Sequence, residues 1–330
     1  MKVAELGFEE LLKTLLPTLD GIVVPQKLNG GVFYTLVTSE EKLKNATLEP
    51  YFGVNCANIL KGFLSGEKRR VAAVVRPCEA RAVIELVKLN QISRDAVVLI
   101  CVDCEGTYDT LELAAKGGFE NQRVACKICE RRLAEFGDIA YVRLGVEKPF
   151  FVTLTPKGEE VLSAAGVPLK ERGVSRAPQS LKEVQKAKEE IKRQLAEVNS
   201  VEKLLDVLRE CILCKNCRDV CPICYCKECF FEKPVGAPMG DALLNIAELR
   251  GGIRLPANLL LFHLVRMYHV SVSCVGCGAC ESACPKDLPL TMLFPVGTES
   301  VRELFDYVPG RDETEPIPLL TYEEDELEPR

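Results

Sequence analysis

Two cysteine runs near the C-terminus constrain this chain more than any other feature of its sequence. Each run has the spacing Cys-x2-Cys-x2-Cys-x3-Cys-Pro. This spacing is typical of ferredoxins that hold two [4Fe–4S] clusters, in which the fourth cysteine of one run ligates the other cluster. We therefore predict one cluster on Cys211, Cys214, Cys217 and Cys284, and a second cluster on Cys274, Cys277, Cys280 and Cys221.

The total cysteine content also favours clusters over disulfides. The 330 residues include 17 cysteines, more than a core needs. Disulfides are rare in reducing compartments, and the acidic Glu5 interrupts the N-terminus where a signal peptide needs an apolar core. Zinc held by paired Cys-x2-Cys elements would not explain two runs that each end in Cys-Pro. We expect a cytoplasmic protein, and the oxygen lability of such clusters suggests an anaerobic host.

Charge and hydropathy exclude two classes of partner. The formal net charge is -6 and the sequence pI is near 5.4, so the chain lacks the basic footprint of a nucleic-acid-binding protein. No apolar run reaches the ~18 residues that predict a membrane span. We therefore expect no nucleic acid and no membrane span.

Residues 1–150 have the pattern of an α/β domain. Short β-rich runs occur at 21–24 and 31–37, and buried apolar runs at 71–75 and 96–100 flank a segment with helical spacing, 82–89. This order of strand, turn, helix and strand predicts a mainly parallel sheet. Functional sites in such sheets lie at the carboxyl ends of strands, and Cys78 and Cys104 each follow one of these ends.

The remaining chain divides into three segments. We predict a helical linker over 151–200, with a capping-box pattern from Ser180 to Glu183 and a charged helix from 182 to 197. An α-helical two-cluster ferredoxin domain follows over 201–295, with a helix at 259–269 between the two runs. Residues 296–330 are expected to form an extended acidic tail.

The cysteines of the first domain allow two assignments. On spacing alone, Cys101-x2-Cys104 with Cys126-x2-Cys129 predicts a zinc or cluster site. However, Arg76-Pro77-Cys78-Glu79, Asp103-Cys104-Glu105-Gly106, the Cys126-x2-Cys129 pair and Gly137-Asp138-Ile139-Ala140 ending at Gly145 resemble the beta subunit family of coenzyme F420 hydrogenases and dehydrogenases. That family includes formate dehydrogenase beta subunits.

The resemblance implies further cofactors. It implies a third [4Fe–4S] cluster on Cys78, Cys104, Cys126 and Cys129, with Cys101 as a buried thiol at the end of a strand. It also implies FAD beside that cluster, and some family members reduce coenzyme F420 there. The sequence departs from the family because the ferredoxin module follows the α/β core and because Gly137 replaces an alanine. Neither a dinucleotide fingerprint nor a P-loop independently supports a nucleotide.

Several cysteines and both histidines remain outside these sets. Three cysteines closely follow the first run; they could supply another cluster or a zinc ion, or line the cluster pocket or a subunit contact as small buried side chains. A lone Cys56 is expected in the core. The histidines are expected to pack or cap near a cluster, the alternatives being metal ligation or a hydrogen bond to a cluster. These residues are Cys224, Cys226, Cys229, His263 and His269.

These patterns together predict an electron-transfer subunit of an anaerobic oxidoreductase complex. Its clusters would exchange electrons with FAD, which converts single electrons into a two-electron hydride equivalent. The expected partners are a formate dehydrogenase or hydrogenase catalytic subunit, or a heterodisulfide-reductase-like flavoprotein, and primary substrate oxidation is expected on a partner chain. The alternative is a flavin-free subunit that docks and carries electrons.

Overall fold

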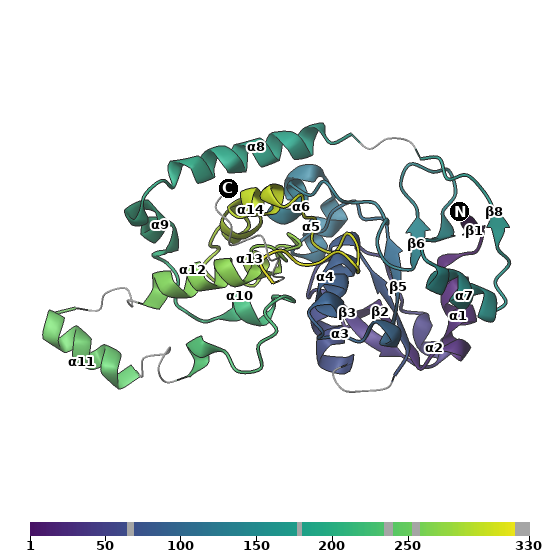
Figure 1. Ribbon diagram of the computed structural model, residues 1–330, viewed down its shortest axis with the longest axis horizontal. Coiled ribbons are helices and arrows are strands. Elements are labelled where there is room, and N and C mark those ends of the chain that lie inside the picture. The colour runs from purple at the N-terminus through teal and green to yellow at the C-terminus, as the bar shows by residue number, and fades with distance from the viewer. Residues whose placement is uncertain (65–68, 177–179, 234–239, 253–257, 321–330) are drawn as a thin grey trace, which may run out of the picture.

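The computed structural model describes residues 1–64, 69–176, 180–233, 240–252 and 258–320. An α/β domain and a helical, cysteine-rich domain lie side by side and contact each other (Figure 1). This is the fold class that the sequence predicts. The part of the predicted acidic tail at 321–330 lies outside the described residues.

In the described residues, eight strands form one mixed sheet in the order β3-β2-β4-β5-β6-β7-β1-β8. The central strands β2, β4, β5 and β6 run parallel to one another, whereas the outer strands β3, β7, β1 and β8 each pair antiparallel with their neighbours. The strands are β1 (Lys2–Ala4), β2 (Gly21–Leu28), β3 (Gly31–Val37), β4 (Val71–Val75), β5 (Val97–Val102), β6 (Ile139–Val142), β7 (Phe150–Thr153) and β8 (Lys170–Glu171).

The predicted strand–helix–strand unit forms as expected. β4 and β5 pair in parallel, with Val71 opposite Val97, and α4 connects them. Both strands are fully buried because apolar clusters cover both faces of the sheet. The helices and short turns of this domain are α1 (Phe8–Leu15), η1 (Leu16–Thr18), α2 (Glu40–Leu43), α3 (Cys56–Leu64), α4 (Pro77–Lys88), η2 (Arg94–Ala96), α5 (Leu111–Lys116), η3 (Phe119–Asn121), α6 (Val124–Lys127) and α7 (Pro156–Ala164).

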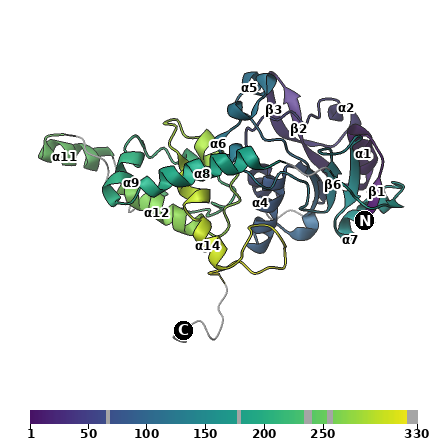
Figure 2. The ribbon, with the colours of Figure 1, turned by 90° about the horizontal axis from the view of Figure 1, so that it is seen from above.

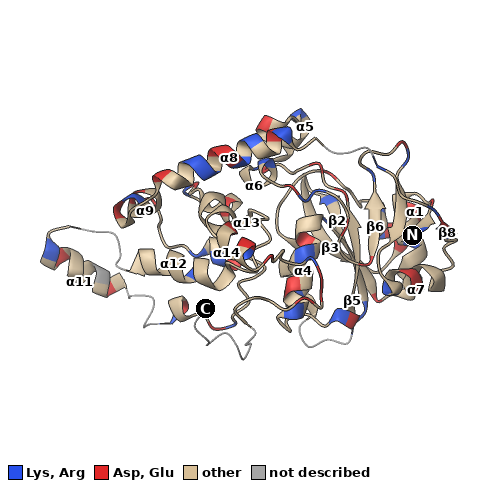
Figure 3. Ribbon diagram, turned by 45° about the horizontal axis from the view of Figure 1, so that its top comes forward, with Lys and Arg blue, Asp and Glu red and all other residues tan. Residues whose placement is uncertain are grey.

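The second domain is helical and contains both cysteine runs. Helix α8 crosses above it and carries Lys and Arg interleaved with Glu (Figure 3). Helix α11 stands apart from the rest of the chain (Figure 2). The elements are α8 (Lys182–Glu197), α9 (Val201–Leu208), α10 (Asn216–Asp219), η4 (Phe230–Glu232), α11 (Gly240–Arg250), α12 (Asn258–Val270), α13 (Ala279–Ser282), η5 (Met292–Val296) and α14 (Glu299–Leu304).

Two segments differ from the expected ranges. The sheet continues past residue 150, because β7 and β8 pair with β1 at the N-terminus. Within the expected tail, residues 299–304 form α14, and the following segment packs on α4. There the buried Glu85 carboxylate accepts hydrogen bonds from Tyr307 Oη at 2.6 Å and from the Gly310 amide at 2.8 Å. Neither contact is visible in local sequence patterns, since the partners are more than two hundred positions apart.

Candidate iron–sulfur site

The two cysteine runs adopt the same backbone conformation. Between their first and second cysteines, Leu213 and Gly276 have φ of 53° and 70°; between the second and third, Lys215 and Gly278 have φ of 64° and 68°. The left-handed residues turn each loop around a common centre, and α10 and α13 then begin at equivalent places. The Leu213 amide nitrogen lies 3.4 Å from Cys211 Sγ, so its N–H group points at the thiol. Backbone N–H groups that point at sulfur are typical of loops that hold iron–sulfur clusters.

The structure brings the first predicted ligand set together. The cysteines Cys211, Cys214, Cys217 and Cys284 line one cavity, so the fourth cysteine of the second run reaches the first run. His263 from α12 also lines this cavity, and its Nε2 lies 3.3 Å from Cys211 Sγ. Burial, and secondarily the charge of Arg266, lowers the pKa of His263 to about 4, so its ring is neutral at pH 7. His269 is exposed.

The second predicted ligand set also converges. Short helices α10 and α13 pack against each other, and Cys221 interacts electrostatically with all three cysteines of the second loop. Burial raises the pKa of Cys274, Cys277 and Cys280, so these thiols release protons when they bind iron.

The three additional cysteines lie beside the first run. A hydrogen bond from the Cys224 thiol lowers the pKa of Cys221, which places Cys224 against a predicted ligand. Cys229 is half-buried against the same apolar cluster of the helical domain as Cys221 and Cys224, and Cys226 is exposed. In the parts of the chain that the structure describes, no three His, Cys, Asp or Glu side chains could share a single metal ion.

The α/β domain brings together the cysteines that the family resemblance indicated. Cys78 lies in the first turn of α4, Cys104 follows β5, Cys126 lies in α6, and Cys129 follows that helix. Cys78 interacts electrostatically with Cys104 and Cys129, and Cys126 with both of these. Cys101 instead lies within β5 at 0% exposure, where it packs in the apolar core with the equally buried Cys56. Burial is the main cause that raises the pKa of Cys104 to about 12.

Buried carboxylates hold the segments that carry these cysteines. Glu79 accepts from the Arg76 amide at 2.9 Å and from Tyr34 Oη at 2.6 Å, which fixes the start of α4 next to Cys78. Asp103 precedes Cys104, and its side chain accepts from the backbone amides of Ala134, Arg143 and Leu144 and from Arg176 Nη1, at 2.7 to 3.0 Å.

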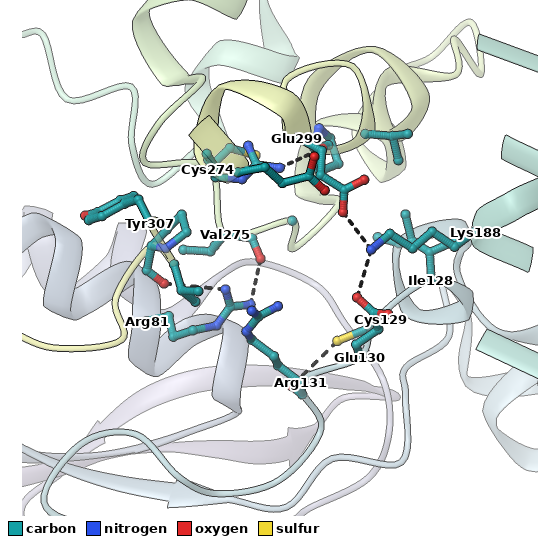
Figure 4. A pocket seen from close by; sticks show the side chains of 18 of the residues that line it. Arg81, Ile128, Cys129, Glu130, Arg131, Lys188, Cys274, Val275, Glu299 and Tyr307 are labelled. Atoms are coloured by element: carbon teal, nitrogen blue, oxygen red, sulfur yellow. Dashed lines mark hydrogen bonds and ion pairs between the residues drawn. The ribbon is translucent and has the colours of Figure 1, made fainter. Parts of the chain in front are cut away.

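The second cysteine run lies directly against the site in the α/β domain. Cys78 interacts electrostatically with Cys277, and Arg81 Nη2 donates to the Val275 carbonyl oxygen at 2.8 Å. A cavity of about 380 Å³ lies between the second cysteine loop and the segment that carries Cys129. Cys129 lines it from the α/β domain and Cys274 lines it from the helical domain (Figure 4). The second predicted ligand set therefore has neighbours on two sides: the first set within the helical domain, and the third set in the α/β domain.

Buried arginines are the part of the site that sequence reasoning missed. Arg81, Arg123 and Arg266 are each at most 5% exposed, and each has side-chain N–H groups without a hydrogen-bond partner among the described residues. Two of them lie three residues from a predicted ligand, Arg81 after Cys78 and Arg123 before Cys126, a spacing that could have drawn attention to them. Cysteine ligands with unsatisfied N–H groups around them fit [4Fe–4S] clusters, because the sulfur atoms of these clusters accept hydrogen bonds. A bound cluster of this kind exchanges single electrons.

Comparisons with known proteins identify relatives of this chain and a family match for its cysteine-rich segment. Residues 180–288, which contain both cysteine runs, match the family described as 4Fe-4S dicluster domain. The F420-dependent formate dehydrogenase subunit beta of Methanocaldococcus jannaschii is 27% identical over 350 positions, which cover 89% of this chain and 86% of the relative. The chain is similar to formate dehydrogenase beta subunits. This confirms the resemblance that the sequence indicated.

Two further similarities were found. The F420-dependent formate dehydrogenase 1 subunit beta of Methanococcus maripaludis is 28% identical over 345 positions, covering 86% of this chain and 84% of the relative. A chain in a solved structure of the F420-reducing [NiFe] hydrogenase complex from Methanosarcina barkeri aligns at 12% identity with a TM-score of 0.46, over 61% of this chain and 93% of that chain. Within the described residues, no helix is both long and apolar enough to cross a bilayer.

Proposed function

We propose that this chain is an electron-relay subunit of an F420-dependent formate dehydrogenase or hydrogenase-like complex. The observation that carries the proposal is the contact between the second cysteine run and the cysteines of the α/β domain. Electrons would pass between the two clusters of the ferredoxin domain and a third cluster in the α/β domain. Substrate oxidation would occur on another subunit of the complex.

The proposed ligand sets follow the convergence described above. The first cluster is assigned to the cavity that includes Cys284, the second to the loop that includes Cys221, and the third to the set that includes Cys78. For the third set, the position of Cys101 inside the apolar core supports Cys78 as the ligand. The complete sets are Cys211, Cys214, Cys217 and Cys284; Cys274, Cys277, Cys280 and Cys221; and Cys78, Cys104, Cys126 and Cys129.

FAD is the proposed point of entry or exit for electron pairs, as the family resemblance implies. The cavity between Cys129 and Cys274 is the candidate position, because a flavin there would border two of the proposed clusters. Its wall includes Arg81, Arg131 and Arg302, which offer cationic groups to the phosphates. F420 or a related acceptor would then exchange a hydride equivalent with the flavin.

Stepwise reduction of the purified chain tests the proposal. A low-potential one-electron donor is mixed anaerobically with the chain, and EPR of the clusters and the absorbance of the flavin are followed in time. We expect the clusters and then the flavin to be reduced. Cys78→Ser should leave both ferredoxin clusters reducible but abolish rapid flavin reduction, whereas the matched Cys101→Ser should keep it.

Two outcomes would count against this function. Rapid flavin reduction in Cys78→Ser would exclude the third cluster from the path. A wild-type chain that holds clusters but no FAD would instead support the flavin-free docking and electron-carrying subunit.

A further inference from the structure

Arg266 is a buried cation on the face of α12 that points toward the cysteines. It lies one turn after His263, which contacts Cys211, and it is 4% exposed. Its Nη2 donates to the Cys217 carbonyl oxygen at 2.8 Å, and its guanidinium carbon lies 4.3 Å from the centre of the Phe294 ring. Its Nε and Nη1 atoms have no hydrogen-bond partner among the described residues.

Cysteines of both loops act on the charge of this guanidinium. Its largest favourable charge interactions are with Cys217, Cys221, Cys280 and Cys224. Cys217 belongs to the first proposed cluster, whereas Cys221 and Cys280 belong to the second. No carboxylate forms an ion pair with Arg266 in the described part of the chain. Arg266 therefore lies close to cysteines of both proposed ferredoxin clusters.

An isolated buried guanidinium with free N–H groups would be strongly destabilising. Two negatively charged, sulfur-rich clusters would provide the missing counter-charge and hydrogen-bond acceptors. Reduction of a cluster adds one electron and one negative charge without a change in its bonds, so a nearby cation stabilises the reduced form. Hydrogen bonds to sulfur and local charge are two of the factors that set cluster potentials.

We propose that Arg266 is a positioning residue shared by the two ferredoxin clusters, and that its Nε and Nη1 groups and its positive charge raise both reduction potentials. This inference rests on the proposed function, which supplies the two clusters, and adds how the protein sets their potentials. A planar guanidinium suits this position because its N–H groups diverge in one plane, whereas a lysine ammonium is a compact point charge.

The test uses the full chain purified anaerobically, with iron and sulfide measured before any titration. Arg266→Gln removes the charge, Arg266→Lys keeps it, and His269→Gln is the control because His269 is exposed on the same helix. Midpoint potentials of both clusters come from EPR-monitored redox titration. In Arg266→Gln we expect both clusters to be retained and both potentials to become more negative, by about a tenfold change in equilibrium constant, which is about 59 mV for one electron.

The variants separate a potential-setting role from a merely structural one. Arg266→Lys should shift both potentials in the same direction by a smaller amount, and His269→Gln should shift neither. Unchanged potentials in Arg266→Gln with intact clusters would overturn the proposal, and a shift of one potential alone would overturn the shared role. If Arg266→Gln loses iron, Arg266→Lys decides: two wild-type potentials in that variant would overturn the proposal.

Failure of this inference is distinguishable from failure of the proposed function. The function fails if the wild-type chain holds no ferredoxin clusters or cannot pass electrons onward. The role of Arg266 fails if the wild-type clusters are present and reducible but their potentials do not depend on this side chain.

Discussion

Arg123 of the α/β domain donates from Nη1 to the carbonyl oxygen of Cys277 in the second cysteine loop, at 3.0 Å. The same side chain donates from Nε to Ser282 Oγ at 2.8 Å, and its guanidinium stacks 3.8 Å from the centre of the Phe52 ring. One buried residue thus joins the loop of the second proposed cluster to the segment that carries Cys126. This contact is therefore one of those that hold the second cysteine loop against the α/β domain.

Replacing Arg123 by alanine should loosen the contact between the domains. The substitution removes two hydrogen bonds across the contact and leaves the Cys277 carbonyl oxygen without its donor, so we expect unfolding to become easier by about 3 kcal/mol. Electron transfer from the ferredoxin clusters to the third cluster should slow. Guanidinium unfolding and freeze-quench EPR measure the two effects. Arg209→Ala is the control, because Arg209 forms an exposed ion pair with Glu210 and no other ion pair among the described residues; equal behaviour of the two variants would contradict this role.

Two glycines of the second cysteine loop offer a second test of the contact between the domains, because the backbone of one of them lies very close to the α/β domain. A Cβ on Gly278 would collide with the Cβ of Ala125 in the α/β domain, whereas a Cβ on Gly276 would meet only Pro295, at 3.6 Å. Both glycines have positive φ, so both alanine variants share a backbone cost of about 1–2 kcal/mol. Gly278→Ala should therefore lower the unfolding midpoint more than Gly276→Ala. A larger decrease of the unfolding midpoint in Gly276→Ala than in Gly278→Ala would show that the close contact between Gly278 and Ala125 does not limit the packing of the two domains.

Double substitutions test the crossed ligation of the ferredoxin clusters. If Cys211 and Cys284 ligate the same cluster, the double Cys→Ser variant should lose about four irons, no more than either single variant. Cys274→Ser combined with Cys284→Ser should lose about eight irons, because the two residues belong to different clusters. Iron and acid-labile sulfide analysis distinguishes these results. The reverse pattern would show that each run ligates its own cluster.

Asp103 is expected to support the third cluster without ligating it. Asp103→Asn keeps the size of the side chain but replaces one acceptor oxygen by an amide that faces backbone N–H groups and Arg176. Loss of these charge-assisted bonds should destabilise the chain by about 2–4 kcal/mol. It should also reduce occupancy of the third cluster more than that of the ferredoxin clusters. Asp206→Asn, in the exposed part of α9 away from this loop, should change neither quantity; wild-type stability in Asp103→Asn would refute the supporting role.

Local patterns predicted the parts of the fold that depend on neighbouring residues. The run Val71–Val75 and the helix Lys182–Glu197 lie where the sequence places them, because apolar composition and periodicity are local properties. The cysteine spacing likewise identified a dicluster domain. The short β1 could not be foreseen: it has three residues and gains its partners in β7 and β8 from the distant end of the domain.

The buried arginines illustrate why the rest of the site could not be predicted from the sequence. Arg266 lies in a segment read as an apolar helix, and a single cation there is compatible with a solvent-facing position. Only the packing of α12 against the first cysteine loop and the Phe294 ring buries it, and that packing combines residues from three separate segments. Arg81 is similar, because its partner Val275 is 194 positions away.

Quantification of iron, acid-labile sulfide and flavin in the anaerobically purified chain tests the central claim most directly. Three cubane clusters with one flavin require about twelve irons, about twelve sulfides and one FAD per chain. Cys78→Ser should reduce the iron to about eight. About eight irons in the wild-type chain, unchanged in Cys78→Ser and without flavin, would contradict the three-cluster relay and leave a two-cluster ferredoxin attached to an α/β docking domain.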